Sequence, residues 1–259
     1  MIDIHSHILP AIDDGPSELE TSLQMLNIAA ENGTTTMIAT PHFHEQIRPK
    51  KHKIIQKLDL LKEEAEKLNI TLYAGMEVYL TPDTPQNLRK DNLLTLAGSN
   101  YLLVEFPFQQ IPSYIDTILF EIMLQGKAPV IAHPERYTEI IENPNKMLKY
   151  LEKGALAQIN SGSLLGYFGQ EVQACAENLL THGMVHFLGS DAHSTGRRKP
   201  ILKQALQQIK EIAGEETANI LSENAEKLIN KKPILSSHRP IEKKNNTSFF
   251  NFFKLRNVR

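Results

Sequence analysis

Side chains that bind metal ions recur along this sequence in short motifs that lie far apart from one another. Two of these motifs, HSH and DAH, place candidate ligands two residues apart, which on an extended strand end point to the same side. The full set of candidates is His5, His7, Asp14, His42, Glu77, Glu105, His133, Asp191 and His193. Imidazole and carboxylate donors without a thiolate suit manganese, iron, zinc, cobalt or magnesium.

These candidates are more numerous than a single ion can use, so we expect a cluster of two or three ions bridged by carboxylates. Such ions lower the pKa of a bound water molecule and make hydroxide available at neutral pH. The chemistry that this donor set predicts is hydrolysis.

Three arginines lie close in sequence to the candidate ligands. Arg136 follows His133 in AHPER, and Arg197 and Arg198 follow His193. A guanidinium group matches the oxygens of a phosphate and offsets the charge that develops in phosphoryl transfer. The alternative for Arg136 is a surface ion pair with Glu135 or Glu139.

Seven short apolar segments alternate with amphipathic ones, which is typical of a parallel α/β protein. The predicted strands are 2–5, 35–40, 71–77, 101–106, 129–133, 156–160 and 185–190. A helix is expected between Ser17, which with Glu20 has the spacing of a capping box, and Gly33. Seven βα units favour a closed or nearly closed barrel, one unit short of the familiar eight, and a doubly wound open sheet is the alternative.

The barrel explains why the candidates are so far apart in sequence. All carboxyl ends of its strands open onto one face, and the candidate ligands come at or just after those ends. No GxGxxG or GxxxxGK[ST] segment follows a predicted strand, so the sequence does not support a Rossmann or P-loop nucleotide site.

Composition sets further limits. The chain has 259 residues, of which 41% are hydrophobic and 22% charged, as in ordinary soluble globular proteins. The single cysteine, Cys175, excludes a disulfide framework. The first residues show neither the basic stretch nor the apolar run of a secretory signal, so we expect a cytoplasmic protein. Residues 1–230 hold 20 basic and 29 acidic residues, which argues against nucleic-acid binding.

Taken in order, DIHSHILPAIDDGP, TPHF, GMEVYL, LVEFP, IAHPER and GSDAH resemble the polymerase-and-histidinol-phosphatase (PHP) superfamily. More narrowly, they resemble the metal-dependent protein tyrosine phosphatases of Gram-positive capsule and exopolysaccharide operons, the CpsB/CapC family. The resemblance covers residues 1–230. It implies a distorted (β/α)7 barrel of the PHP type, two or three Mn²⁺ ions, and dephosphorylation of the tyrosine-rich tail of an autophosphorylating bacterial tyrosine kinase, which regulates capsular polysaccharide synthesis.

The resemblance also assigns roles to residues. It implies three groups of metal ligands: His5, His7, Glu77 and Asp191; Glu77, Glu105 and His133; and Asp14, His42 and His193. Glu77 and a hydroxide would bridge ions, so Glu77 also counts among the catalytic residues. Arg136 matches the family's phosphate-binding arginine, and the second arginine is either Arg197 or Arg198. Cys175 has Thr181 six residues later, so the CxxxxxR signature of cysteine phosphatases is absent.

Aromatic residues next to the candidate ligands have two interpretations. Phe43, Phe106, Phe108 and Tyr137 could stack on a substrate tyrosine or simply pack at the end of the barrel. Three other functions stay open: a small-molecule phosphatase of the histidinol-phosphate type, a metal-dependent nuclease, and a nonenzymatic regulatory subunit. The acidic body disfavours the nuclease.

Residues 231–259 form a second, basic segment after the predicted barrel. Their composition predicts a flexible tail that ends in SFFNFFKLRNVR. Phe249, Phe250, Phe252 and Phe253 could contact the inner face of the membrane or pack on the body of the protein.

Overall fold

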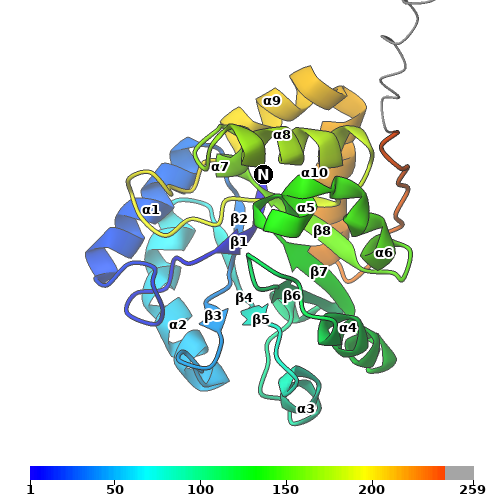
Figure 1. Ribbon diagram of the computed structural model, residues 1–259. Coiled ribbons are helices and arrows are strands. Elements are labelled where there is room, and N and C mark those ends of the chain that lie inside the picture. Colours follow the sequence, from blue (N-terminus) through cyan, green and yellow to red (C-terminus); the bar gives the residue numbers. More distant parts are fainter. Residues whose placement is uncertain (243–259) are drawn as a thin grey trace, which may run out of the picture.

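The structure, a computed structural model, describes residues 1–242. Its strands are β1 Ile2–Ser6, β2 Thr36–Ala39, β3 His42–Phe43, β4 Thr71–Ala74, β5 Glu77–Tyr79, β6 Tyr101–Glu105, β7 Ala128–Ala132, β8 Leu156–Asn160 and β9 Phe187–Gly189. Its α-helices are α1 Leu19–Glu31, α2 Lys51–Lys67, α3 Thr84–Arg89, α4 Tyr114–Leu124, α5 Thr138–Glu142, α6 Leu148–Leu151, α7 Ser161–Leu164, α8 Gln170–Thr181, α9 Lys203–Ala213 and α10 Glu215–Ile229. Figure 1 shows the strands in the middle of the molecule with helices around them.

The strands pair in parallel and follow one another around the sheet in chain order. One sheet has the order β1-β2-β4, and the other has the order β3-β5-β6-β7-β8-β9. The two sheets share chain segments, because β2 leads into β3 and β4 leads into β5. Each of the seven predicted segments therefore contains a strand. β3 lies just beyond the second predicted segment, 35–40, and the third, 71–77, contains β4 and the first residue of β5. The first break lies at Pro41, which has no N–H to donate.

The last strand returns to the first. Ser6 and Ala192 form an isolated parallel bridge, and the amide of His7 donates to the carbonyl of Ala192 at 2.9 Å. The amide of Asp191 donates to the carbonyl of His5 at 2.8 Å. The strands thus form a distorted ring of parallel α/β units, and the doubly wound alternative, whose strands would not follow in chain order, is not supported.

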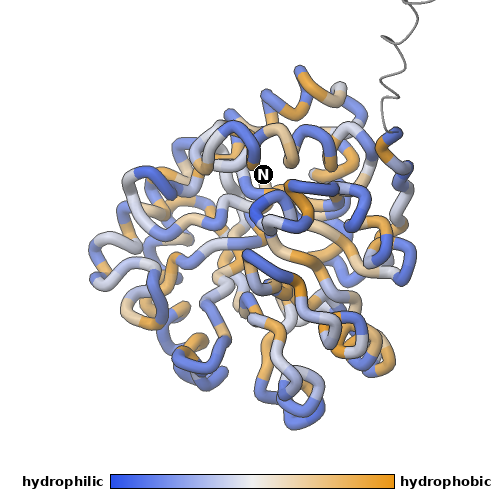
Figure 2. Tube along the Cα trace, in the orientation of Figure 1, coloured by the Kyte–Doolittle hydropathy of each residue, from blue (hydrophilic) through white to orange (hydrophobic). Residues whose placement is uncertain are grey.

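Two apolar clusters hold this ring together. The larger one lies between the strands and the surrounding helices and includes Leu26, Ile54 and Leu179. The smaller one fills the inside of the ring with Ile4, Leu103 and Val130 and is closed by Leu228 of α10. In Figure 2 the central strand segments are largely hydrophobic, whereas many outer helical turns are hydrophilic.

The inner surface of the ring becomes polar toward the carboxyl ends of the strands, because alternate side chains of each strand face it. Leu103 and Glu105 share one face of β6, and Leu156 and Gln158 share one face of β8, because side chains two residues apart point the same way. The inner surface is thus apolar in the middle of the ring and polar at its carboxyl end.

The first helix differs in detail from its prediction. α1 begins at Leu19, its N-cap is Glu18, and no side chain caps it. The Ser17 and Glu20 capping box is therefore not formed, because Ser17 lies one residue before the N-cap position that this motif requires. The predicted end is confirmed, since Gly33 follows the helix with a φ of 79°.

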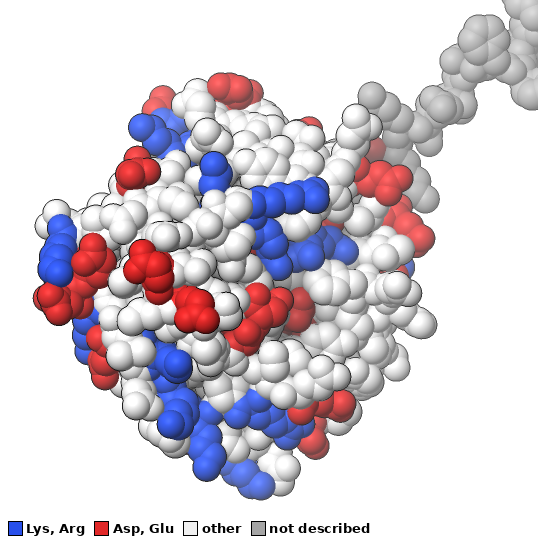
Figure 3. All heavy atoms as spheres, turned by 90° about the vertical axis from the view of Figure 1, so that its left-hand side faces the viewer, with Lys and Arg blue, Asp and Glu red and all other residues white. Residues whose placement is uncertain are grey.

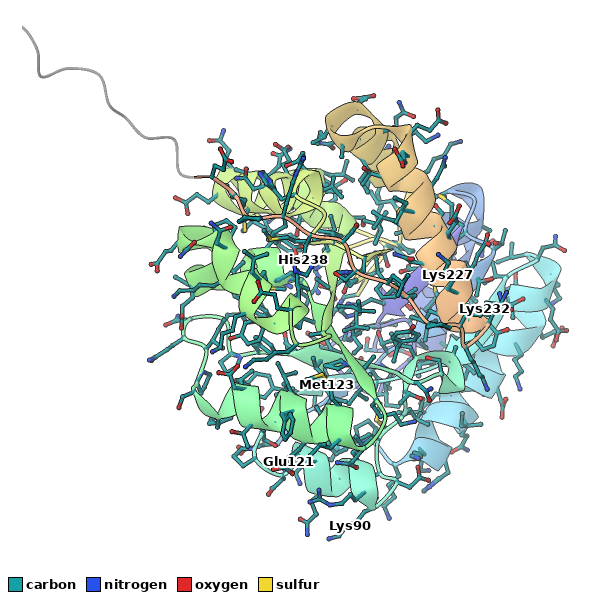
Figure 4. The ribbon with its side chains drawn as sticks, turned by 90° about the vertical axis from the view of Figure 1, so that its right-hand side faces the viewer. Lys90, Glu121, Met123, Lys227, Lys232 and His238 are labelled. Atoms are coloured by element: carbon teal, nitrogen blue, oxygen red, sulfur yellow. The ribbon has the colours of Figure 1, made fainter. Side chains whose placement is uncertain are left out.

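The described part of the predicted tail lies against the ring. We call residues 232–242 the strap; Figure 4 shows it crossing one side of the molecule from Lys232 past His238. The Tyr101 hydroxyl donates to the Lys232 carbonyl at 2.9 Å, and the Arg239 amide donates to the His182 carbonyl at 3.0 Å. Phe249, Phe250, Phe252 and Phe253 lie outside the described residues. Within residues 1–242, none of the helices combines the length and the apolar character that crossing a membrane requires.

Candidate metal centre

The candidate ligands meet at the carboxyl ends of the strands. Glu77, at the start of β5, lies at the centre, with Oε2 3.4 Å from His5 Nε2 and 3.2 Å from His7 Nε2. His5 and His7 approach each other to 3.1 Å between their Nε2 atoms. Asp191 Oδ1 lies 3.5 Å from each of these two nitrogens.

A second group lies on the other side of Glu77. His133 Nε2 is 2.8 Å from Glu77 Oε1 and 3.6 Å from Glu105 Oε1. His42, Glu77 and Glu105 can also offer donor atoms that all lie within 4.8 Å of one another. His42 therefore belongs to this group as well as to the one for which the sequence predicted it.

A third group surrounds Asp14, whose side chain is 57% exposed at the mouth of the ring. Its Oδ1 lies 3.2 Å from His193 Nε2 and 3.4 Å from His42 Nε2. His7 joins this group, since His7, Asp14, His42 and His193 have donor atoms within 4.8 Å of one another. The structure thus brings all the candidates together, with His7 and His42 shared between groups.

Two of these residues have strained backbones. His133 has a φ of 33° and Asp191 has a φ of 51°, values in the left-handed region that side-chain-bearing residues rarely adopt. Each directly follows the end of a strand or lies within two residues of it. Strained backbone of this kind is common at functional sites.

The buried donors fit divalent cations. Among the described residues, Glu77 Oε2, His42 Nδ1 and His193 Nε2 are buried and make no well-aligned hydrogen bond. His42 Nδ1 lies 2.9 Å from Glu77 Oε2, and His193 Nε2 lies 3.2 Å from Asp14 Oδ1. Burial, with Glu77 and Asp191 nearby, raises the pKa of Glu105 to about 9. Carboxylates gathered at this spacing repel one another unless positive charge lies among them. Buried nitrogen and oxygen donors gathered this closely suit a cluster of divalent ions.

Asp13, Gln158 and Asn160 orient the ligands, and the sequence analysis missed them. His7 Nδ1 donates to Asp13 Oδ2 at 2.8 Å, and His5 Nδ1 donates to Gln158 Oε1 at 2.8 Å. These bonds leave Nε2 of each histidine free to bind a metal, as outer partners of metal-binding histidines do.

A short chain of hydrogen bonds links two ligands through β8. Gln158 Nε2 donates to Asn160 Oδ1 at 2.8 Å, and Asn160 Nδ2 donates to Asp191 Oδ2 at 2.7 Å. β8 carries no ligand of its own but connects His5 to Asp191. The one signal in the sequence is that two polar residues, Gln158 and Asn160, stand two apart in an otherwise apolar predicted strand.

The arginines divide between the site and its surroundings. Arg136 Nη1 lies 3.3 Å from Asp191 Oδ2, so the predicted alternative of a surface pair with Glu135 or Glu139 is wrong. Glu135 is buried and accepts the Asn160 amide, and Glu139 pairs with Lys146.

Arg198 and Arg197 face different partners. Arg198 Nη2 lies 2.8 Å from Asp191 Oδ2, and its Nε is buried with no partner among residues 1–242. Arg197 is exposed and donates to the carbonyl of Tyr167. Figure 3 shows basic side chains in groups on either side of acidic ones on the face that it presents.

The aromatic candidates differ in exposure. Phe106 and Tyr137 are fully buried and Phe43 nearly so, which makes them packing residues, whereas Phe108 is 36% exposed. Cys175 is buried with its Sγ 3.7 Å from the Ile140 carbonyl, and burial raises the pKa of its thiol to about 12. A thiol in this state is a poor nucleophile.

Comparison with known proteins identifies relatives over almost the whole chain. Residues 1–230 match the family model described as capsular polysaccharide synthesis, CpsB/CapC. The tyrosine-protein phosphatase YwqE of Bacillus subtilis is 38% identical over 254 residues, which are 96% of this chain and 100% of that protein. The tyrosine-protein phosphatase CpsB of Streptococcus agalactiae is 32% identical over 88% of this chain and 98% of its own length.

A solved structure agrees with these relatives. It comes from work on YwqE of Bacillus subtilis and CpsB of Streptococcus pneumoniae, described as unique metal-dependent tyrosine phosphatases. It superposes with a TM-score of 0.89 and 37% identity, covering 94% of this chain and 100% of that one.

Proposed function

This chain belongs to the CpsB/CapC family, and we propose on that basis that it is a metal-dependent phosphatase that hydrolyses phosphotyrosine in proteins. The observation that carries this proposal is the cluster of buried imidazoles and carboxylates with Arg136 and Arg198 at its edge. Cation-binding donors beside two guanidinium groups suit a phosphate monoester.

Each part of the site has a task in this reaction. His5, His7, Asp14, His42, Glu77, Glu105, His133, Asp191 and His193 would hold the ions. When bound, divalent ions supply positive charge for the phosphoryl oxygens and lower the pKa of water so that it can act as a nucleophile. Glu77, whose carboxylate contacts several of the histidines, would be shared between ions.

The arginines would bind the phosphoryl oxygens that the ions leave free. Arg136 and Arg198 both contact Asp191 Oδ2, so one carboxylate oxygen brings both guanidinium groups to the same edge of the site. We propose Arg198 as the second phosphate-binding arginine because its buried Nε has no other partner among the described residues. A guanidinium already in place loses little freedom when the phosphate arrives.

The finer features of the proposal rest on the family and on the donor set. We propose two or three Mn²⁺ ions, since three overlapping ligand groups of nitrogen and oxygen are present. We propose that the substrate is an autophosphorylating tyrosine kinase of a capsule pathway. We also propose that this protein acts in the cytoplasm. The exposure of Asp14 and Phe108 beside the candidate ligands suits a phosphotyrosine that extends from a flexible protein tail. Membrane contact through the C-terminal phenylalanines stays a prediction from the sequence.

Phosphate release from a tyrosine-phosphorylated peptide tests the proposal. We expect release with Mn²⁺, loss on adding a chelator, and a fall of about 100-fold or more in His5→Ala and Arg136→Ala proteins. Arg89→Ala is the matched control, because Arg89 pairs with Glu121 away from the site.

Other substrates separate the alternatives. Turnover of histidinol phosphate without turnover of the peptide would replace the protein substrate by a small molecule. Cleavage of DNA would favour the nuclease, and inactivity toward every phosphoester would favour the regulatory subunit.

A further inference from the structure

The polar contacts of Arg136 are too few to fix the orientation of its guanidinium group. Among residues 1–242 its ion-pair partner is Asp191, through one contact of 3.3 Å to Oδ2. The same oxygen accepts from Asn160 at 2.7 Å and from Arg198 at 2.8 Å. The contact of Arg136 is the longest of the three, and a single contact does not fix the plane of a guanidinium group.

Two aromatic rings lie against this guanidinium group. Its Cζ is 4.8 Å from the centroid of the Phe108 ring and 4.5 Å from that of Phe168. Phe108 follows β6, Arg136 follows β7, and Phe168 follows β8. Since β7 lies between β6 and β8, the rings reach Arg136 from the loops on its two sides.

The turn that carries Phe168 is held by a backbone hydrogen bond and by close packing around Gly162. The Tyr167 amide donates to the Gly162 carbonyl at 2.9 Å. A Cβ atom on Gly162 would lie 3.2 Å from ring atoms of both Phe168 and Tyr167, so a glycine at this position leaves room for the rings. The guanidinium of Arg197 donates to the Tyr167 carbonyl and ties this turn to the loop after β9.

Phe108 is also held in place although it is partly exposed. Its ring stacks on that of His133 at 5.6 Å with an angle of 16° between the planes. The amide of Thr138 donates to the Phe108 carbonyl at 2.8 Å. The segment that follows Arg136 therefore fixes the backbone that carries Phe108.

We propose that Phe108 and Phe168 are positioning residues, which hold the Arg136 guanidinium in the orientation that binds a phosphoryl oxygen. The inference rests on the proposed phosphatase function. A ring face attracts a cation, and contact with two rings restricts rotation of the planar group. Arg136 is thereby oriented before the phosphate binds, which is how supporting residues contribute to an active site.

Substitutions of Phe168 separate ring electrostatics from packing. In the full chain with Mn²⁺, we expect Phe168→Ala and Phe168→Leu to lower kcat/KM for a phosphotyrosine peptide about tenfold. Phe168→Tyr should stay close to wild type because it keeps the ring. If leucine restores activity, packing alone explains the site and the proposal is overturned.

A double substitution tests whether Phe168 acts through Arg136. In an Arg136→Ala background, Phe168→Ala should cause no further loss, since the group that it positions is gone. Independent losses that multiply would show that Phe168 acts in another way. Phe120→Ala is the matched control, because Phe120 is 56% exposed on α4.

A readout that needs no catalysis separates this inference from the proposed function. Butanedione modifies arginine side chains, and mass spectrometry of the peptide that contains Arg136 gives its rate of modification. We expect faster modification in Phe168→Ala and Phe168→Leu than in wild type, Phe168→Tyr and Phe120→Ala. An unchanged rate overturns the inference. A changed rate in a protein that releases no phosphate would support the positioning and refute the phosphatase.

Discussion

Replacing Gln158 by leucine should weaken metal binding without touching a ligand. His5 Nδ1 and Gln158 Oε1 are 2.8 Å apart, and both residues are completely buried. Leucine removes the acceptor and leaves a buried N–H without a partner, at a cost of about 1–3 kcal/mol. Loss of such an outer partner typically lowers metal affinity about 10- to 100-fold, since the histidine is no longer held in the orientation that binds the ion.

Calorimetric titration of the metal-free protein with Mn²⁺ measures this effect directly. The dissociation constant should rise about 10- to 100-fold in Gln158→Leu, while kcat at saturating Mn²⁺ changes little. Gln207→Leu is the control, since the exposed side chain of Gln207 donates to Glu211 on α9. Unchanged affinity together with a lower kcat would refute the reasoning that Gln158 acts by orienting His5.

Four further predictions follow from individual contacts. Arg198→Ala should lower kcat/KM about 100-fold and Arg197→Ala much less, and equal losses would contradict the choice of Arg198. Gly189→Ala would place a Cβ 2.8 Å from His5 Cβ, so the free energy of unfolding in urea should fall by about 1–3 kcal/mol; an unchanged value would contradict the close approach. Leu228→Ala, inside the ring, should lower that free energy by about 2–5 kcal/mol with kcat preserved at low temperature, and a loss of kcat would indicate that this packing reaches the site. Burial lowers the pKa of His186 to about 4, whereas its pKa in the unfolded state is about 6.5. Below pH 6.5 the folded state therefore binds fewer protons than the unfolded state, and the free energy of unfolding decreases as the pH is lowered. His186→Gln should therefore reduce the difference in unfolding free energy between pH 7 and pH 5 by about 2 kcal/mol, and an identical difference in both proteins would argue against a neutral His186.

The ligands were predictable because a local pattern places them. A strand is recognisable from its period of two, and a parallel ring brings the carboxyl ends of all its strands together, so His5 and His133 could be assigned to one site from sequence. The same logic could not divide the ligands into groups. His7 and His42 each lie near two groups, which the spacing of the motifs along the chain does not determine.

The supporting residues were not predictable because their partners are distant in sequence. Gln158 bonds to a histidine 153 residues away, and nothing next to it in the sequence indicates this. Arg197 and Arg198 are adjacent, and the backbone of the loop decides which of them faces Asp191. The predicted capping box of Ser17 and Glu20 is absent because the N-cap of α1 is Glu18, one residue after Ser17. The spacing of a motif does not by itself fix the residue at which a helix begins.

The isolated bridge between Ser6 and Ala192 marks the place where the first and last strands of the ring meet, and the candidate metal centre lies there. His5 and His7 belong to the first strand, and Asp191 and His193 follow the last, so the ligands stand on both sides of the join where backbone pairing is sparsest. Ions held between them would act as a removable cross-link between the two ends of the ring. Because such ions bind only the closed arrangement, their binding free energy adds to the stability of closure. The concentration of metal ions would then affect the stability of the fold as well as the activity of the site.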